Sequence, residues 1–390
     1  TTSQALFSAS WEIDFWGRYR RAIEADRAAF LGSVAAYDDA RVTLIADVAS
    51  SYVRLRTLEE RLRVARQNVE AQRESLRIVS VQFKSGATGE RDVRQATTQL
   101  AQTQAQIPKF EESLRQTRHA LAVLLGETPD RIEARLTSPG RIPLAPEGIA
   151  TGIPRDLLRR RPDVRAAELA AASASALIGV ARADLYPAFS LSGTFGFAST
   201  RAGGHSLTDL ADWPNRAYGL TGGFFMPLFN YGRLTNQVRV QDARFQAAAL
   251  RYRNAVLNAQ REVEDGLATF QCRRQAAALL AQAVEAARRS TALATSQYQG
   301  GQTDYTTVIL AEQTQLDVED ALAEAQGGVA QGIIAVYRAL GGGWQTRQER
   351  DVVSDDIKAE MARRTNWGRL LEPSEHLPET PGAENGGTNP

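Results

Sequence analysis

The sequence contains very little cysteine, histidine or methionine: one, three and two of them in 390 residues. The single cysteine, Cys272, can form no intrachain disulfide, and we interpret it as a small buried side chain in a helix. His119, His205 and His376 are far apart and follow no spacing typical of a metal site. These scarcities leave few groups for metal binding or acid–base chemistry, so no metal, cofactor or catalytic residue is predicted.

Long apolar runs and an excess of one charge are also missing. No run of about 18 apolar residues occurs and the mean hydropathy is −0.32, so no membrane-spanning helix is predicted. Any contact with lipid must then come from strands. The 46 Lys and Arg residues balance 45 Asp and Glu residues. Because nucleic acids attract strongly basic surfaces, this balance favours other partners.

What the sequence does contain is an internal repeat with an offset of 215 residues. Phe15–Arg18 aligns with Asn230–Arg233, and the turn at Phe83–Gly86 aligns with Tyr298–Gly301. The register holds without a gap to the end of each copy. We interpret the chain as a tandem duplication.

Each copy predicts a long helix, from Gly17 to Gly86 and from Gly232 to Gly301. About 66 helical residues would span roughly 100 Å, several times the ordinary helix length. Apolar residues recur in steps of four and three along the first helix, the heptad pattern of a coiled coil, with Gln72 as the one polar interruption. The seam of the second helix has smaller residues, which favours close approach of the helix axes.

Shorter helices are predicted to run back from the two glycine turns, over about Arg91–Leu125 and Asp304–Leu340. Each copy therefore forms an antiparallel hairpin with its tip at the turn. A further helix is predicted from Arg155 to about Arg182. It begins near an arginine triplet, residues 159–161, which we interpret as a solvated or inter-subunit face.

Between the helical blocks the hydrophobic pattern changes to the alternation typical of strands, at the chain start, after Pro187 and over Tyr218–Met226. One face of each strand is aromatic or aliphatic and the other is small or polar, as in transmembrane barrel strands. A soluble half-buried sheet has the same alternation, but helices of about 100 Å beside these strands favour a barrel stacked on a helical tube. The predicted lipid-facing residues are Phe7, Trp11, Phe189, Leu191, Phe195, Phe197, Leu220 and Phe224.

The repeat also divides the chain. Residues 1–130 form the first repeat, 131–154 a linker, and 155–344 the second repeat with a β-hairpin at 187–230. Residues 345–390 are a polar tail that we expect to be largely disordered. The duplication implies four strands where three are visible, so we expect the first repeat to be incomplete at its N-terminal end.

Five stretches in a fixed order identify a family. They are Ser10–Arg18, Leu157–Asp163, Ile178–Pro187, Phe229–Arg233 and Tyr337–Trp344. Together they resemble the TolC-like outer-membrane efflux proteins, especially those of the OprM and NodT type, over nearly the whole chain up to Trp344.

The resemblance implies a mainly helical protein with membrane strands, and no enzyme. Long hairpins of three copies would form an α-barrel across the periplasm, joined to a transmembrane β-barrel that trimerisation completes in the outer membrane of a Gram-negative bacterium. Partners implied by the family are outer-membrane lipid, a periplasmic membrane-fusion adaptor and an inner-membrane pump, often of the resistance-nodulation-division class. The duct would be passive, closed at the helical tip and opened by an iris-like movement.

The resemblance also implies functional residues at the hairpin tips. The constriction would be lined by Asp304, Tyr305, Thr306, Leu310 and Gln313, with Arg91, Asp92 and Arg94 from the first hairpin. Adaptor docking would map to Gly86, Ala87, Gly301 and Gln302. This chain departs from the family because relatives carry an acidic residue at the place of Leu310 and an arginine at that of Gln313. Whether the gate is ionic or hydrophobic therefore stays open.

Two other classes of function fit less of the sequence. A scaffolding coiled coil leaves the alternating strands unexplained, and Gly341–Gly343 lacks the Lys-Ser/Thr of a phosphate loop. Within export, type I protein secretion and heavy-metal efflux remain alternatives to small-molecule efflux. The sequence determines neither the cargo, nor the identity of pump and adaptor, nor lipidation upstream of residue 1.

Overall fold

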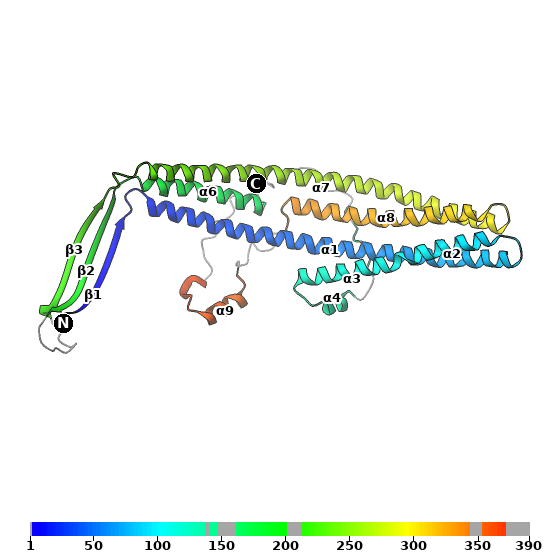
Figure 1. Cartoon of the computed structure of the whole chain (residues 1–390), viewed down its shortest axis with the longest axis horizontal. Helices are drawn as coiled ribbons and strands as arrows, with labels where there is room; N and C mark the ends of the chain where they lie inside the picture. Colours follow the sequence, from blue (N-terminus) through cyan, green and yellow to red (C-terminus); the bar gives the residue numbers. More distant parts are fainter. Residues whose placement is uncertain are drawn as a thin grey trace, which may run out of the picture. The chain divides into compact units, whose positions relative to one another are not determined.

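The computed structural model describes residues 2–136, 140–144, 146, 161–200, 213–343 and 353–371 (Figure 1). The chain is mainly helical, as predicted, and its described strands form one sheet. The elements in chain order are β1 (Thr2–Ile13), α1 (Arg18–Lys84), α2 (Glu90–Gln104), α3 (Gln106–Leu125), α4 (Pro129–Arg135), α6 (Pro162–Ala183), β2 (Ala188–Thr200), the 3-10 helix η2 (Trp213–Asn215), β3 (Arg216–Phe225), α7 (Arg233–Gln299), α8 (Tyr305–Ala339), α9 (Asp355–Arg364) and the 3-10 helix η4 (Gly368–Leu371).

Two helices of 67 residues each, α1 and α7, confirm the predicted long helical blocks. Each spans about 100 Å at 1.5 Å per residue. Gly17 and Gly232 precede them with φ angles of 79° and 78°, in the left-handed region that glycine adopts without strain. The strands therefore pass into both long helices through the same kind of backbone turn.

The returning helices complete two antiparallel hairpins, α1 with α2 and α3, and α7 with α8 (Figure 1). Helix α8 is continuous, whereas the first returning helix is interrupted at Ala105, which the predicted single helix did not foresee. Pro108 explains the break, because its ring clashes with the carbonyl of Gln104 and it has no N–H to donate. At the place of Pro108 the second hairpin has Ala323, which is buried.

Helices α7 and α8 approach each other closely, as the small seam residues predicted. A Cβ built at Gly332 would lie 3.0 Å from the Cα of Phe270, and one at Gly266 would lie 3.1 Å from Cγ2 of Val336. Cys272 does not belong to this seam. It is exposed, so the prediction of a buried side chain is wrong, and it lies in a stretch of α7, residues 271–275, that is exposed throughout.

Helix α6 lies between α1 and α7 (Figure 1) and begins at Pro162, later than the predicted start at Arg155, which lies outside the described residues. Val164 packs on Ala259 of α7. Although no spanning helix was predicted, this alanine-rich helix has the length and apolar composition of one, which is weak evidence on its own. Arg161, at the N-cap of this helix, is 7% exposed. The prediction of a solvated arginine is therefore wrong for this residue. The other two arginines lie outside the described residues.

The sheet has the order β1-β2-β3, with both pairs antiparallel. Residues directly opposite each other share a face. Phe7 is paired with Phe195, which is paired with Tyr218, and Ile13 is paired with Phe189, which is paired with Phe224. The register therefore places the predicted apolar residues of all three strands on one face.

The helices and strands up to α8 belong to one compact unit that ends at Gly342, and helix α4 within it extends from Pro129 to Arg135. In the tail, helix α9 forms where disorder was expected. Acidic residues occupy its first turn and Arg363 and Arg364 its last, so its charges complement the helix dipole.

Candidate functional site

The tips of the two hairpins are turns of the same construction. Gly86 and Gly301 have φ angles of 76° and 69°. The N–H of Ala87 donates to the carbonyl of Gln82 at 2.9 Å, and that of Gln302 donates to the carbonyl of Gln297 at 2.8 Å. Such bonds close the end of a helix around a left-handed residue. The four residues predicted for adaptor docking, Gly86, Ala87, Gly301 and Gln302, are all exposed at these turns.

Just behind the turns, an apolar cluster joins the two hairpins. Its buried members are Val79, Ala96, Ala294, Tyr298, Tyr305 and Val308. The rings of Tyr298 and Tyr305 are 5.2 Å apart. Tyr305 is only 2% exposed, and burial raises the pKa of its hydroxyl. In this conformation Tyr305 lies buried in the contact between the two hairpins.

The charged residues predicted for the gate bind within their own hairpins. Arg91 lies 3.5 Å from Asp92, and Arg94 lies 2.8 Å from Glu90. The carboxylate of Asp304 caps α8 by accepting from the N–H of Thr307 at 3.2 Å. These charges are therefore engaged locally, next to the tip.

Leu310 and Gln313 lie about one turn apart on α8 and have different surroundings. Leu310 is 58% exposed. Gln313 donates to Oε1 of Gln99 on α2 at 2.7 Å and so binds the second hairpin to the first. Thr306, one turn before Leu310, is partly buried. Of the predicted lining residues on α8, Leu310 is the large apolar side chain that points away from the hairpin core.

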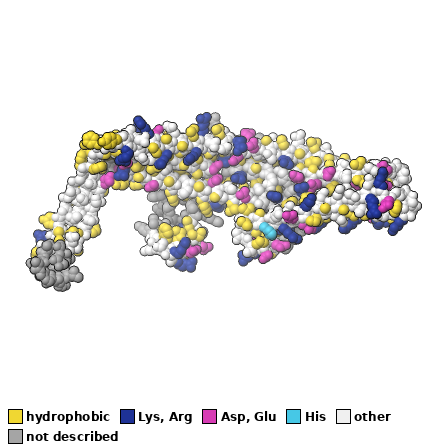
Figure 2. All heavy atoms as spheres, viewed as in Figure 1, with side chains coloured by type: hydrophobic (Ala, Val, Ile, Leu, Met, Phe, Trp, Pro, Cys, Tyr) yellow, Lys and Arg dark blue, Asp and Glu magenta, His cyan; other side chains and the backbone are white. Residues whose placement is uncertain are grey.

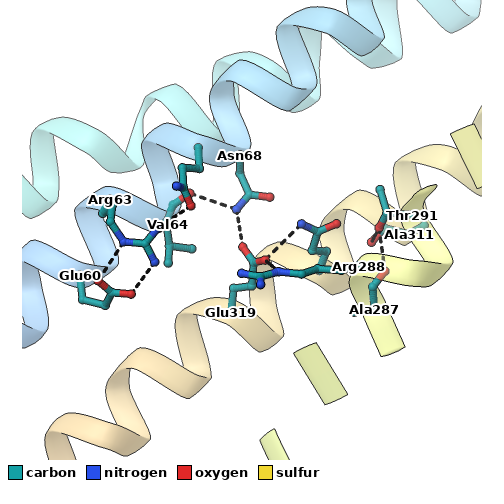
Figure 3. A network of polar contacts seen from close by, with 11 residues as sticks. Glu60, Arg63, Val64, Asn68, Ala287, Arg288, Thr291, Ala311 and Glu319 are labelled. Atoms are coloured by element: carbon teal, nitrogen blue, oxygen red, sulfur yellow. Dashed lines mark hydrogen bonds and ion pairs between the residues drawn. The ribbon is translucent and has the colours of Figure 1, made fainter. Parts of the chain in front are cut away.

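Farther from the tip, a polar stripe lies between α1 and α8, which sequence analysis missed. We define it as Asn68, Gln72 and Ser75 of α1 with Glu312, Gln315 and Glu319 of α8. Asn68 donates to Glu319 at 2.9 Å, and the hydroxyl of Ser75 donates to Glu312. Arg288 of α7 donates to the other oxygen of Glu319 at 2.6 Å (Figure 3). The stripe thus connects helices from both hairpins.

The buried groups of the stripe are not fully satisfied. Glu312 is 5% exposed and Gln72 is 2% exposed. Oε2 of Glu312 and both amide atoms of Gln72 have no hydrogen-bond partner among the described residues. Desolvation raises the pKa of Glu312, and the hydrogen bond from Ser75 opposes that shift. Gln72 was visible as an interruption of the heptad pattern, but the pairing of Asn68 and Ser75 with α8, more than 200 residues away, was not.

Beyond the stripe a paired arginine strengthens the same contact. The guanidinium of Arg61 donates to both carboxylate oxygens of Asp320 at 2.7 Å. Bidentate pairs of this kind are among the stronger charge-assisted bonds. The two hairpins are therefore joined by an apolar cluster at the tip and by polar bonds along the rest of α8.

At the opposite end of the helices, the apolar face of the sheet is largely uncovered. Phe7 is 74%, Trp11 62%, Leu220 77% and Phe224 63% exposed. Hydrophobic side chains also gather where the strands join the helices (Figure 2). There the ring nitrogen of Trp16 donates to the carbonyl of Pro187 at 2.8 Å. The sheet therefore has an exposed apolar face at one end, whereas the helices at the other end are polar and charged.

Comparison with known proteins agrees with this geometry. The family pattern described as Outer membrane efflux protein matches residues 1–127 and 153–342. The chain belongs to this family. It is 33% identical over 345 residues to the pyoverdine export outer membrane protein OpmQ of Pseudomonas putida, covering 88% of this chain and 72% of that protein. It is 30% identical over 346 residues to the nodulation protein T of Rhizobium leguminosarum bv. trifolii, covering 88% and 72%.

Solved structures of outer membrane efflux proteins have the same fold. The outer-membrane channel OprN matches with a TM-score of 0.82 and 32% identity, covering 88% of this chain and 82% of that one. The relatives and structural neighbours are outer-membrane channels and not enzymes. As an outer membrane efflux protein, this chain belongs to the outer membrane of Gram-negative bacteria, with its helices extending into the periplasm. The recognition made from the five sequence stretches is confirmed.

Proposed function

We propose that three copies of this chain form a passive exit duct. In this proposal the repeats arose by duplication, the sheets of the three copies complete one transmembrane β-barrel, and the hairpins form an α-barrel through the periplasm. One observation carries the proposal: an exposed apolar sheet face stands at one end of helices about 100 Å long. A scaffolding coiled coil would not require an exposed apolar face on its sheet.

The proposed partners act at the other end. The exposed turns at Gly86–Ala87 and Gly301–Gln302 would bind a periplasmic adaptor, and an inner-membrane pump of the resistance-nodulation-division class would supply the energy. Cargo would be small molecules, a class that includes the pyoverdine named for one relative. For heavy metals, no group of three or more His, Cys, Asp or Glu residues suited to a metal occurs in the described residues.

Planar-bilayer recording of the protein expressed with its natural termini tests the proposal. We expect stable insertion of a trimer with small, flickering conductance, because the apolar sheet face enters the lipid while the tips stay closed. A folded trimer that never inserts would contradict the duct and favour the scaffold.

We further propose that the resting gate is hydrophobic and centred on Leu310. The charges near the tip bind within their own hairpins, whereas Leu310 is exposed on α8. Apolar constrictions close a pore by excluding water from it. Three copies of Leu310 around the axis would form such a constriction.

Replacing Leu310 by serine is therefore expected to open the closed channel. Conductance should rise about tenfold, because a polar ring lets water enter the constriction. Leu293→Ser is the matched control, since Leu293 is 46% exposed on the neighbouring helix α7 and has no proposed part in the gate. Equal conductance of the two variants would show that Leu310 does not close the pore.

Cross-linking tests whether the second hairpin is the part that moves. Cysteine placed at Thr306 should give disulfides between copies that hold the tips closed and reduce efflux from cells. Cys272 must first be replaced by serine, because it is exposed and would form competing products. Unchanged efflux despite complete cross-linking would contradict a moving second hairpin.

A further inference from the structure

Arg161 joins the start of α6, the end of α8 and the middle of α7 at one point. Its guanidinium donates to both carboxylate oxygens of Asp163 on α6, at 3.0 and 2.8 Å. It also donates to Glu262 of α7 at 2.8 Å and to the backbone carbonyl of Ala339, the last residue of α8, at 2.7 Å. The base of α8 is thereby tied to α6 and α7 through a single side chain.

The position of Arg161 shows that these bonds are needed. An arginine that is 7% exposed would be costly without partners, because an uncompensated charge would then lie away from water. The carboxylates of Asp163 and Glu262 hold its pKa above the ordinary value, although desolvation lowers it. The carbonyl at the C-terminal end of α8 carries the negative end of the helix dipole, so a cation fits there.

The backbone directly after α8 packs closely against the side chain of Arg161. Gly341 has a φ angle of 70°, and a Cβ built on it would lie 3.0 Å from Cγ and 3.2 Å from Cα of Arg161. A cavity of about 110 Å³ beside the guanidinium also reaches Asp39 of α1. Burial and the nearby Asp163 raise the pKa of Asp39. All four long elements of this region therefore meet around Arg161.

The rest of α8 is bound differently. Between its base and its tip, α8 is bound to α1 by polar bonds, several of them at partly exposed groups, such as Arg61 with Asp320 and Gln331 with the carbonyl of Ser50. Partly exposed groups can bond to water when the helices separate, so these bonds cost less to break than those of a buried arginine. Helix α8 has 35 residues and a length of about 52 Å. A rotation of about 10° at its base would displace its tip by about 9 Å.

We infer that Arg161 is a positioning residue that anchors the base of α8, so that this helix swings about a fixed point when the tip opens. Without the anchor, the base of α8 would be free to move, and the closed position of Leu310 near the tip would no longer be fixed. This inference rests on the proposed duct and gate, and it assigns a gating part to a residue far from the constriction.

Spin labels separate anchoring from a merely structural part. In a Cys272→Ser background, a label at Tyr337, exposed near the base of α8, reports local mobility, and labels at Thr306 report distances between tips. Arg161→Gln should free the label at Tyr337 and broaden the tip distances. Open probability in bilayers should rise about tenfold, which corresponds to a coupling of about 1.4 kcal/mol. Arg161→Lys, which keeps the charge but loses the bidentate geometry, should lie between Arg161→Gln and the parent.

Arg182→Gln is the matched control, because Arg182 is an exposed arginine on the same helix. If Arg161→Gln does not fold, Arg161→Lys and Gly341→Ala disturb the same point more gently. Folded trimers of these variants with tip distances and open probability like those of the parent would overturn the inference. A parent channel that does not conduct would instead overturn the proposed function, so the two failures are distinguishable.

Discussion

Replacing Tyr305 by alanine is expected to separate the tips of the two hairpins. The side chain is 2% exposed within the apolar cluster, and its ring packs against that of Tyr298. Removing a buried aromatic side chain costs about 3–5 kcal/mol, since it leaves a cavity as well as losing apolar burial. Two of the other buried members, Ala96 and Ala294, are too small to fill the cavity.

Hydrogen exchange measured by mass spectrometry would locate the effect. Exchange should become faster in the segments around Val79 and Val308, while the region near the strands should stay protected. Tyr305→Phe keeps the ring and should behave like the parent. Tyr337→Ala removes a tyrosine that is 61% exposed on the same helix and should have little effect. If Tyr305→Ala leaves exchange at the tip unchanged, the cluster does not hold the hairpins together.

Rising pH is expected to weaken the contact between the hairpins through Glu312. Its carboxyl is buried and its pKa is raised by desolvation above the ordinary 4.5. A carboxyl whose pKa is raised in the closed contact favours that contact when protonated. Its contribution is therefore complete below about pH 4.5 and is lost as the pH rises through the raised value. The charged groups nearest along the stripe are Glu319 and Arg288, which bind each other.

Open probability in bilayers, measured between about pH 4 and pH 8, would test this sign. The parent channel should open more at the alkaline end, because an ionised Glu312 has only the hydroxyl of Ser75 as a hydrogen-bond partner among the described residues. Glu312→Gln keeps the shape without the titration, so its open probability should be nearly independent of pH. Glu324→Gln, at a carboxylate that is 60% exposed on the same helix, should keep the parent profile. A profile shared by the parent and Glu312→Gln would assign the effect to another group.

The periodic parts of the fold were predictable from the sequence. Helix ends at Gly86 and Gly301 and the shared face of Phe195 and Phe224 follow from turn chemistry and from alternation, which are local properties. The interruption after Gln104 was equally predictable from the sequence, because it depends on Pro108 alone. The proline ring clashes with the preceding turn, and proline has no N–H to donate.

The contacts between polar residues were not predictable in this way. Asn68 meets Glu319 across 251 positions, and Arg161 meets the carbonyl of Ala339 across 178. A heptad pattern says which residues face a partner helix, but the identity of the facing residue depends on how the hairpins pack. Charge alone made Arg161 look like a surface residue, and its burial depends on the carboxylates of Asp163, two residues further along the chain, and of Glu262 on α7.

The polar stripe also fixes the register of α8 along α1. Glu312 lies opposite Ser75, and Glu319 lies opposite Asn68. Sliding α8 along α1 by one helical turn would bring Glu312 against Val79 in one direction, or Glu319 against Ala65 in the other. Both of these are among the most buried apolar positions of α1. Either shift would place a carboxylate in a hydrophobic contact, at a high cost. The hairpins can therefore part sideways far more easily than they can slip lengthwise, so each closure returns them to the same alignment.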